Sequence, residues 1–258
     1  MFSFFEKIRV GPFSFSKGSN PIMPTKYSLK TYIAGGFYHI YNRGVEKRRI
    51  FLDDQDYRVF LYYFKIYLSS KEVILNEIKV DMTLTEEEKA EKIIEISRLN
   101  NFYKKIDLIC FVLMNNHYHL LLRQEEKNCI EMFMRSLNTK YVKYFNFKYQ
   151  RVGPLFQSRY KGVLIEKEDY FLHISRYIHL NPLEILSSEK NLVSYPWSSY
   201  SAYLRKQNIT WINKTYLKEY FKKFNGFNFN SYQGFVEGYK EQEEEKTNYR
   251  KILFDLEQ

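Results

Sequence analysis

The chain has 258 residues, 45% of them hydrophobic, and no uncharged apolar run of 18 residues, so it is neither a disordered tail nor a membrane protein. Its 40 lysine and arginine residues against 30 acidic ones give a net charge of +10, which favours nucleic acid as a partner, although a membrane surface would also fit. Two cysteines outside any CxxC pair exclude a disulfide scaffold and a four-cysteine zinc site.

The first 30 residues show little periodicity, and we interpret them as a loosely ordered N-terminal extension. Charges interrupt the apolar start at residues 1–5, which makes it a poor signal peptide, so we expect a cytoplasmic protein. Residues 37–43 are rich in strand-forming side chains and predict a strand. Asp53 or Asp54 could cap a following helix, whose apolar stripe is Tyr57, Phe60, Leu61, Phe64 and Leu68.

The middle of the chain predicts a helical insertion and then a hairpin. Within the spacer at residues 70–104, residues 83–100 predict a charged, solvated helix with capping-box patterns beginning at Thr83 and at Thr85. Residues 107–114 form a continuous apolar run, which is typical of a buried strand. The adjacent asparagines at 115 and 116 signal a turn into a second strand over residues 117–123.

The remaining pattern predicts a long helix over residues 127–149, a strand over 159–166 and a helix over 168–180. We expect this last helix to stop before Asn181, because a residue before proline disfavours the α conformation. The order of elements is that of the ferredoxin-like split βαβ, an α+β fold whose antiparallel sheet carries helices on one face. We expect one domain over residues 31–189 and a C-terminal accessory region over residues 190–258.

The sharpest local motif is the pair of histidines at 117 and 119, which flank Tyr118 in a predicted strand. Residues two apart on a strand share a face, so both imidazoles can coordinate the same metal ion. Two histidines alone do not complete a metal site, and a pair of ordinary core or surface histidines is the alternative.

The helix over residues 168–180 offers partners, because His173, Tyr177 and Asn181 are spaced by four residues and share a face. An Asn181 oxygen beside two imidazoles suits Mg²⁺ or Mn²⁺, whereas His173 as the third ligand would favour zinc. Tyr177 is a candidate nucleophile, because a phenolate leaves more readily than an alkoxide and so suits a reversible covalent step. Simple packing of Tyr177 is the alternative.

Residues 132–165 contain seven basic side chains and no acidic one, with aromatic rings interleaved. Such a segment can bind phosphates with its charges and unstacked bases with its rings. A lysine-rich solvent face above an aromatic core face is the alternative, and Tyr141 and Tyr144 fit that core face. The predicted DNA-binding residues are Arg43, Arg135, Lys140, Lys143, Lys148, Arg151, Arg159 and Lys161.

Four segments in order, FYHIYNRGVEKRRIF, CFVLMNNHYHLLLR, GPLFQSRYKGVLIEKEDYFLHISRYIHLNP and YPWSSYSAY, resemble the REP-associated tyrosine transposases, which are single-tyrosine HUH transposases. The resemblance runs from about residue 35 to residue 203. It implies a ferredoxin-like nuclease that acts with a divalent metal on single-stranded DNA near hairpins. It further implies that His117 and His119 bind the metal, that Asn181 is the third ligand, and that attack by Tyr177 leaves a 5′-phosphotyrosine and a free 3′-hydroxyl.

Two other interpretations stay open from the sequence. A catalytically silent or domesticated derivative would keep the basic, aromatic surface without cleaving DNA. A replication-initiation or relaxase-type nuclease would use similar chemistry with another arrangement of motifs. The sequence also leaves open whether the protein is a monomer or a homodimer.

Overall fold

The computed structural model describes residues 32–186, 191–224 and 229–238; the predicted N-terminal extension lies outside them. Four strands, β1 (Phe37–Arg43), β2 (Ile106–Leu113), β3 (His117–Gln124) and β4 (Lys161–Ile165), form an antiparallel sheet in the order β2-β3-β1-β4. This is the ferredoxin-like strand order, so the predicted α+β fold class is confirmed.

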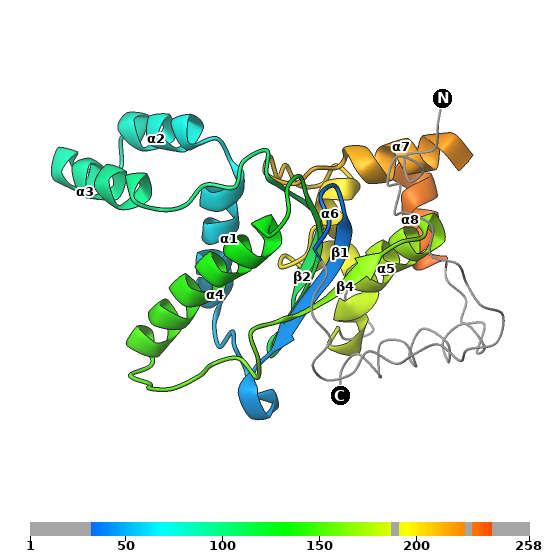
Figure 1. Ribbon diagram of the computed structural model, residues 1–258, viewed down its shortest axis with the longest axis horizontal. Coiled ribbons are helices and arrows are strands. Elements are labelled where there is room, and N and C mark those ends of the chain that lie inside the picture. The colour runs from blue at the N-terminus through cyan, green and yellow to red at the C-terminus, as the bar shows by residue number, and fades with distance from the viewer. Residues whose placement is uncertain (1–31, 187–190, 225–228, 239–258) are drawn as a thin grey trace.

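Two long helices, α1 (Asp54–Leu68) and α4 (Cys129–Lys148), cover one face of the sheet (Figure 1). The Asp53 side chain caps α1 by accepting a hydrogen bond from the backbone N–H of Asp56, 3.1 Å away. Phe60 of α1, Tyr141 of α4 and Tyr118 of β3 pack together, with ring centroids 4.8 and 5.3 Å apart. These contacts belong to the largest of three hydrophobic clusters in the described part of the chain.

The opposite face is covered as well, which corrects the expectation of helices on one face only. Here lie α5 (Glu168–Leu180) and the helices α6 (Tyr200–Tyr203), α7 (Thr215–Phe224) and α8 (Phe229–Glu237) (Figure 1). Ile174 and Ile178 of α5 join Leu121 of β3 in the second core. Helical periodicity identifies an apolar stripe but does not say which face of a sheet receives it.

The C-terminal region also covers the edge of β2. Across this edge the N–H of Leu113 donates to the carbonyl of Trp197 (2.9 Å), and the N–H of Ser199 donates to that of Phe111 (3.0 Å). Such bonds satisfy the backbone groups that an edge strand would otherwise expose. Part of the region expected to be accessory therefore completes the sheet.

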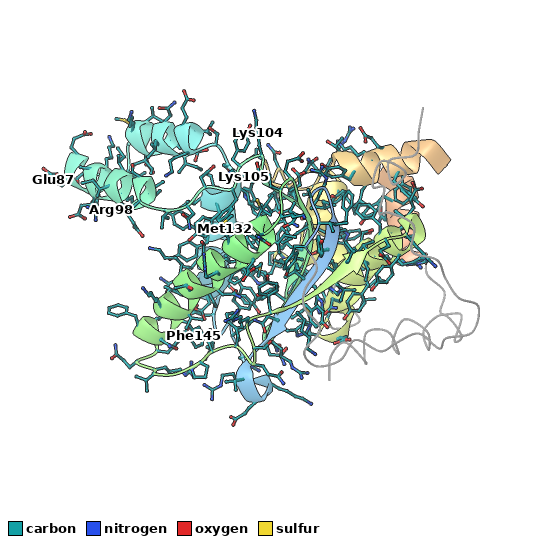
Figure 2. All side chains as sticks on the ribbon, in the orientation of Figure 1. Glu87, Arg98, Lys104, Lys105, Met132 and Phe145 are labelled. Carbon is teal, nitrogen blue, oxygen red and sulfur yellow. The ribbon has the colours of Figure 1, made fainter. Side chains whose placement is uncertain are left out.

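The insertion consists of α2 (Lys71–Val80) and α3 (Glu86–Ser97), which project away from the sheet, as Figure 2 shows for Glu87 on α3 and for Arg98 directly after it. The predicted capping box at Thr85 forms, whereas Thr83 instead donates to the carboxylate of Asp81. None of the helices in the described ranges is long and apolar enough to span a bilayer.

The helix α5 ends at the predicted residue, but for a different reason. Asn181 keeps helical dihedral angles (φ −48°, ψ −40°), and its N–H still donates to the carbonyl of Tyr177. Pro182 then opens a short 3-10 turn (Asn181–Glu184), where its missing N–H costs nothing. This continuation holds the Asn181 side chain one turn beyond Tyr177.

Candidate active site

The two histidines of β3 lie on the face of the sheet that α5 covers. Tyr118, between them, is fully buried in the core on the opposite face, as the alternation of a strand requires. His119 is buried and His117 is half-buried, and their ring centroids are 5.1 Å apart. Both imidazoles therefore lie on the side of the sheet that α5 covers.

The helix α5 brings two further predicted residues to these histidines. The ring of Tyr177 lies edge-on to the ring of His119, with centroids 5.2 Å apart. Asn181 is buried, and its Oδ1 lies 3.1 Å from Nε2 of His117. Tyr177 and Asn181, 58 or more residues from the histidines in sequence, thus complete one compact group with them.

A third histidine, which the sequence analysis missed, belongs to the same group. His39 of β1 is fully buried, and its Nε2 lies 2.9 Å from Nδ1 of His119. Tyr41 stacks beside both rings, at 5.1 Å from His39 and 5.6 Å from His119. The signal was present, because residues 37, 39 and 41 share a strand face and β1 neighbours β3 in a ferredoxin-like sheet.

Burial makes the inner histidines neutral. It lowers the pKa of His39 to about 3 and lowers the pKa of His119 well below its usual value, where nearby His39 and His117 add to the effect. A neutral imidazole has one lone pair, so these rings can act as metal ligands or as hydrogen-bond acceptors without first losing a proton.

The residues present fit a divalent cation. Nε2 of His119 is buried and has no hydrogen-bond partner among the described residues, which costs about 1–3 kcal/mol unless a ligand binds it. His117 and Asn181 supply a second nitrogen and an oxygen. Within the described ranges no group of three or more His, Cys, Asp and Glu side chains is placed to hold a metal ion.

The same finding corrects the zinc alternative, in which His173 would be the third ligand. His173 lies one turn before Tyr177, but its Nδ1 is 2.6 Å from Nη2 of Arg176. Its ring is 6.5 Å from that of Phe235 in α8. The spacing of four residues predicted that His173 shares a helix face with Tyr177. In the structure, the side chain of His173 instead lies beside Phe235 of α8.

Some of the predicted DNA-binding residues lie on the face of the candidate site. Arg43 is the cross-strand partner of His117, and Lys161 is that of Tyr41, so both side chains share the face of the histidines. The Lys161 ammonium lies 5.8 Å from the centre of the Tyr41 ring. Arg159, two residues before Lys161, is exposed.

The predicted cations of α4 lie across the sheet from α5 (Figure 1), with Arg135 and Lys143 exposed. Lys140 is 3.7 Å from a carboxylate oxygen of Glu95. Beyond the end of this helix, Arg151 donates to Asn146 and lies over the ring of Phe145. The structure therefore separates the predicted cations into two groups on opposite layers.

Lys148 is engaged inside the protein. Its ammonium donates to the carboxylates of Asp53 and Asp56, at 2.7 and 2.9 Å. Burial alone would lower the pKa of Lys148, but the hydrogen bonds to Asp53 and Asp56 outweigh it and raise that pKa. Because Asp56 is fully buried, this ammonium neutralises an internal carboxylate and is poorly placed to bind a phosphate.

The competing tyrosines lie elsewhere. Tyr141 is fully buried in the first core, where its hydroxyl donates to the carbonyl of Ile50. The hydroxyl of Tyr144 donates to Asp56, 3.0 Å away. The prediction that these two residues belong to the packing of α4 is confirmed.

Comparison with known proteins finds a family model that matches part of the chain. Residues 78–181 match the family model described as "Transposase IS200 like". No curated protein matches the sequence. A solved REP-associated tyrosine transposase bound to a REP hairpin is 13% identical, with a TM-score of 0.45 over 72% of this chain and 96% of that chain. A tRNA(His) guanylyltransferase from Saccharomyces cerevisiae is 9% identical, with a TM-score of 0.27 over 80% of each chain.

The matched residues 78–181 include His117, His119, Tyr177 and Asn181, which are the side chains that the fold brings together. This part of the chain is therefore similar to the IS200-like transposases.

Proposed function

We propose that this protein is a transposase, a metal-dependent single-strand DNA endonuclease and strand transferase that acts near hairpins through a 5′-phosphotyrosine. The observation that carries the proposal is the position of Tyr177 on α5, 5.2 Å from the ring of His119, while Asn181 on the same helix lies against His117. A nucleophile and a set of metal-binding side chains on one face are what phosphoryl transfer requires.

In the proposed reaction, the phenolic oxygen of Tyr177 forms a bond to the phosphorus and the bond from phosphorus to the 3′-oxygen breaks. The phenol gives up its proton and the departing 3′-oxygen takes one up, which leaves a free 3′-hydroxyl. The phosphodiester energy is kept in the tyrosine ester, so attack by a 3′-hydroxyl reverses the step without ATP.

His117, His119 and Asn181 would hold Mg²⁺ or Mn²⁺, with positions left for water and phosphate oxygens. A bound ion would withdraw charge from the scissile phosphate and stabilise the transition state. The neutral state of His119, which follows from its lowered pKa, keeps a lone pair ready for this role.

For the DNA, we propose a path across the face of the sheet that holds the histidines, with Arg43, Arg159 and Lys161 contacting phosphates. The first and last of these share that face by strand register. Arg135, Lys140, Lys143 and Arg151 would contact DNA only where it continues around the sheet toward α4.

The test is a labelled hairpin oligonucleotide with a single-stranded flank, incubated with Mn²⁺ and run on a denaturing protein gel. The native protein should give a covalent protein–DNA band, and Tyr177→Phe should give none, because only the attacking oxygen is missing. Tyr170→Phe, on the same helix, is the matched control and should retain the band.

An adduct formed by Tyr177→Phe would contradict the assignment of the nucleophile. Hairpin binding without any adduct, in the native protein with Mn²⁺, would favour the catalytically silent derivative. Both outcomes are read on the same gel, with hairpin binding measured separately by fluorescence anisotropy.

A further inference from the structure

We infer that His39 is a positioning residue: it accepts a hydrogen bond from Nδ1–H of His119 and so keeps Nε2 of His119 as the lone-pair atom directed at the metal. The inference rests on the proposed function and assigns a role to a side chain on β1, outside the residues 78–181 that match the family model.

The geometry limits the pair to two arrangements. Nε2 of His39 and Nδ1 of His119 are 2.9 Å apart, which is hydrogen-bond distance. A neutral imidazole has one N–H and one lone pair, so one ring must donate and the other must accept. If His39 donates, His119 carries its proton on Nε2; if His39 accepts, Nε2 of His119 is bare.

Only the arrangement in which His39 accepts the hydrogen bond leaves His119 able to coordinate a cation through Nε2. Nδ1 of His39 and Nε2 of His119 are both buried without a hydrogen-bond partner among the described residues. A proton on Nε2 of His119 would repel a divalent ion. When His39 accepts, that same atom presents a lone pair. A metal-bound histidine commonly donates its other ring N–H to a neighbouring acceptor, which fixes both its tautomer and its orientation.

The packing around His39 holds its ring against that of His119. His39 is fully buried, and its ring is nearly parallel to that of His119, with an interplanar angle of 18°. Tyr41 stacks on His39 at 5.1 Å, and Tyr177 meets it edge-on at 6.1 Å. The same ring therefore lies against both the metal-binding histidine and the nucleophile.

The inference can be tested without cleavage. In His39→Gln, the side-chain amide oxygen can reach the position of Nε2 and accept the same hydrogen bond. In His39→Phe, a ring of similar size remains but the acceptor is lost. Mn²⁺ affinity, measured by electron paramagnetic resonance of the free ion in the absence of DNA, should fall about 10–100-fold in His39→Phe. It should stay within a few-fold of the native value in His39→Gln.

A second readout needs no variant. In the native protein saturated with Mg²⁺ and labelled with ¹⁵N-histidine, long-range ¹⁵N–¹H correlation spectra should show His119 protonated on Nδ1. A proton on Nε2 of His119, or native Mn²⁺ affinity in a folded His39→Phe, would overturn the inference. Tyr177→Phe should bind Mn²⁺ normally, so a failed nucleophile assignment and a failed role for His39 give different results.

Discussion

At the scale of single residues, the strand histidines and the tyrosine were predictable because each depends on a local period. Alternation put His117 and His119 on one strand face, and a spacing of four residues linked Tyr177 to Asn181. His39 was not found in this way, because its partner is 80 residues away and only the pairing of β1 with β3 brings the two together.

The proposed metal-ligand set predicts different outcomes for substitutions at His117 and at His173. His117→Ala removes one proposed ligand from a half-buried position, so the covalent adduct should be lost while folding and hairpin binding stay near native. Chelation with EDTA should abolish the adduct of the native protein in the same gel assay, and added Mn²⁺ should restore it.

His173→Ala is the matched control for that experiment. His173 lies on the same helix as Tyr177 but contacts Arg176, so its loss should leave the adduct yield unchanged. Loss of the adduct in His173→Ala, with retention in His117→Ala, would reverse the proposed ligand set.

At the scale of elements, composition could not tell which cations of an acid-free segment face solvent. The sequence predicts Lys148 to be free for DNA binding, because no acidic residue is near it in sequence. Asp53 and Asp56, more than 90 residues away at the start of α1, occupy its ammonium. The packing of α1 against α4 brings these carboxylates to Lys148. Contacts between elements so far apart in sequence cannot be predicted from local sequence patterns.

The separation of the cations into two layers predicts unequal roles in DNA binding. Charge reversal of Arg43 together with Lys161, on the face of the histidines, should weaken hairpin binding regardless of sequence. It should also reduce the dependence of log affinity on log salt by about 1.4, since each lost single-strand phosphate contact accounts for about 0.7.

Charge reversal of Arg135 together with Lys143 is the comparison, because both residues are exposed on α4, across the sheet. We expect it to change affinity less than the first pair does. Fluorescence anisotropy over a salt series measures both variants, and a larger loss in the α4 pair would move the proposed DNA path to the other layer.

At the scale of the whole molecule, the C-terminal region anchors the helix that carries Tyr177. Fully buried His179 of α5 lies 2.6 Å from the Tyr232 hydroxyl of α8 and 2.8 Å from Oγ of Ser199. Ser199 Oγ in turn accepts from the N–H of Phe111 in β2. The sequence indicated four strands and an amphipathic α5, but this network joins three distant segments and could not be predicted from periodicity.

The anchoring network predicts a stability effect far from the site. Tyr232→Phe removes one hydroxyl and leaves Nδ1 of buried His179 without that partner, so the free energy of unfolding should fall by about 1–3 kcal/mol. Urea denaturation followed by circular dichroism measures it. Tyr62→Phe, at an exposed position on α1, should change stability by less than about 0.5 kcal/mol.

The central claim, that Tyr177 becomes covalently attached to DNA, is tested most directly by mapping the adduct. Cleavage after Arg176 and Lys190 by trypsin would release residues 177–190, which contain a single tyrosine. Mass spectrometry of the nuclease-trimmed adduct should find a nucleotide joined through its 5′-phosphate to Tyr177 in that peptide. A nucleotide on any other tyrosine, or a cleaved strand with no modified peptide, would contradict it.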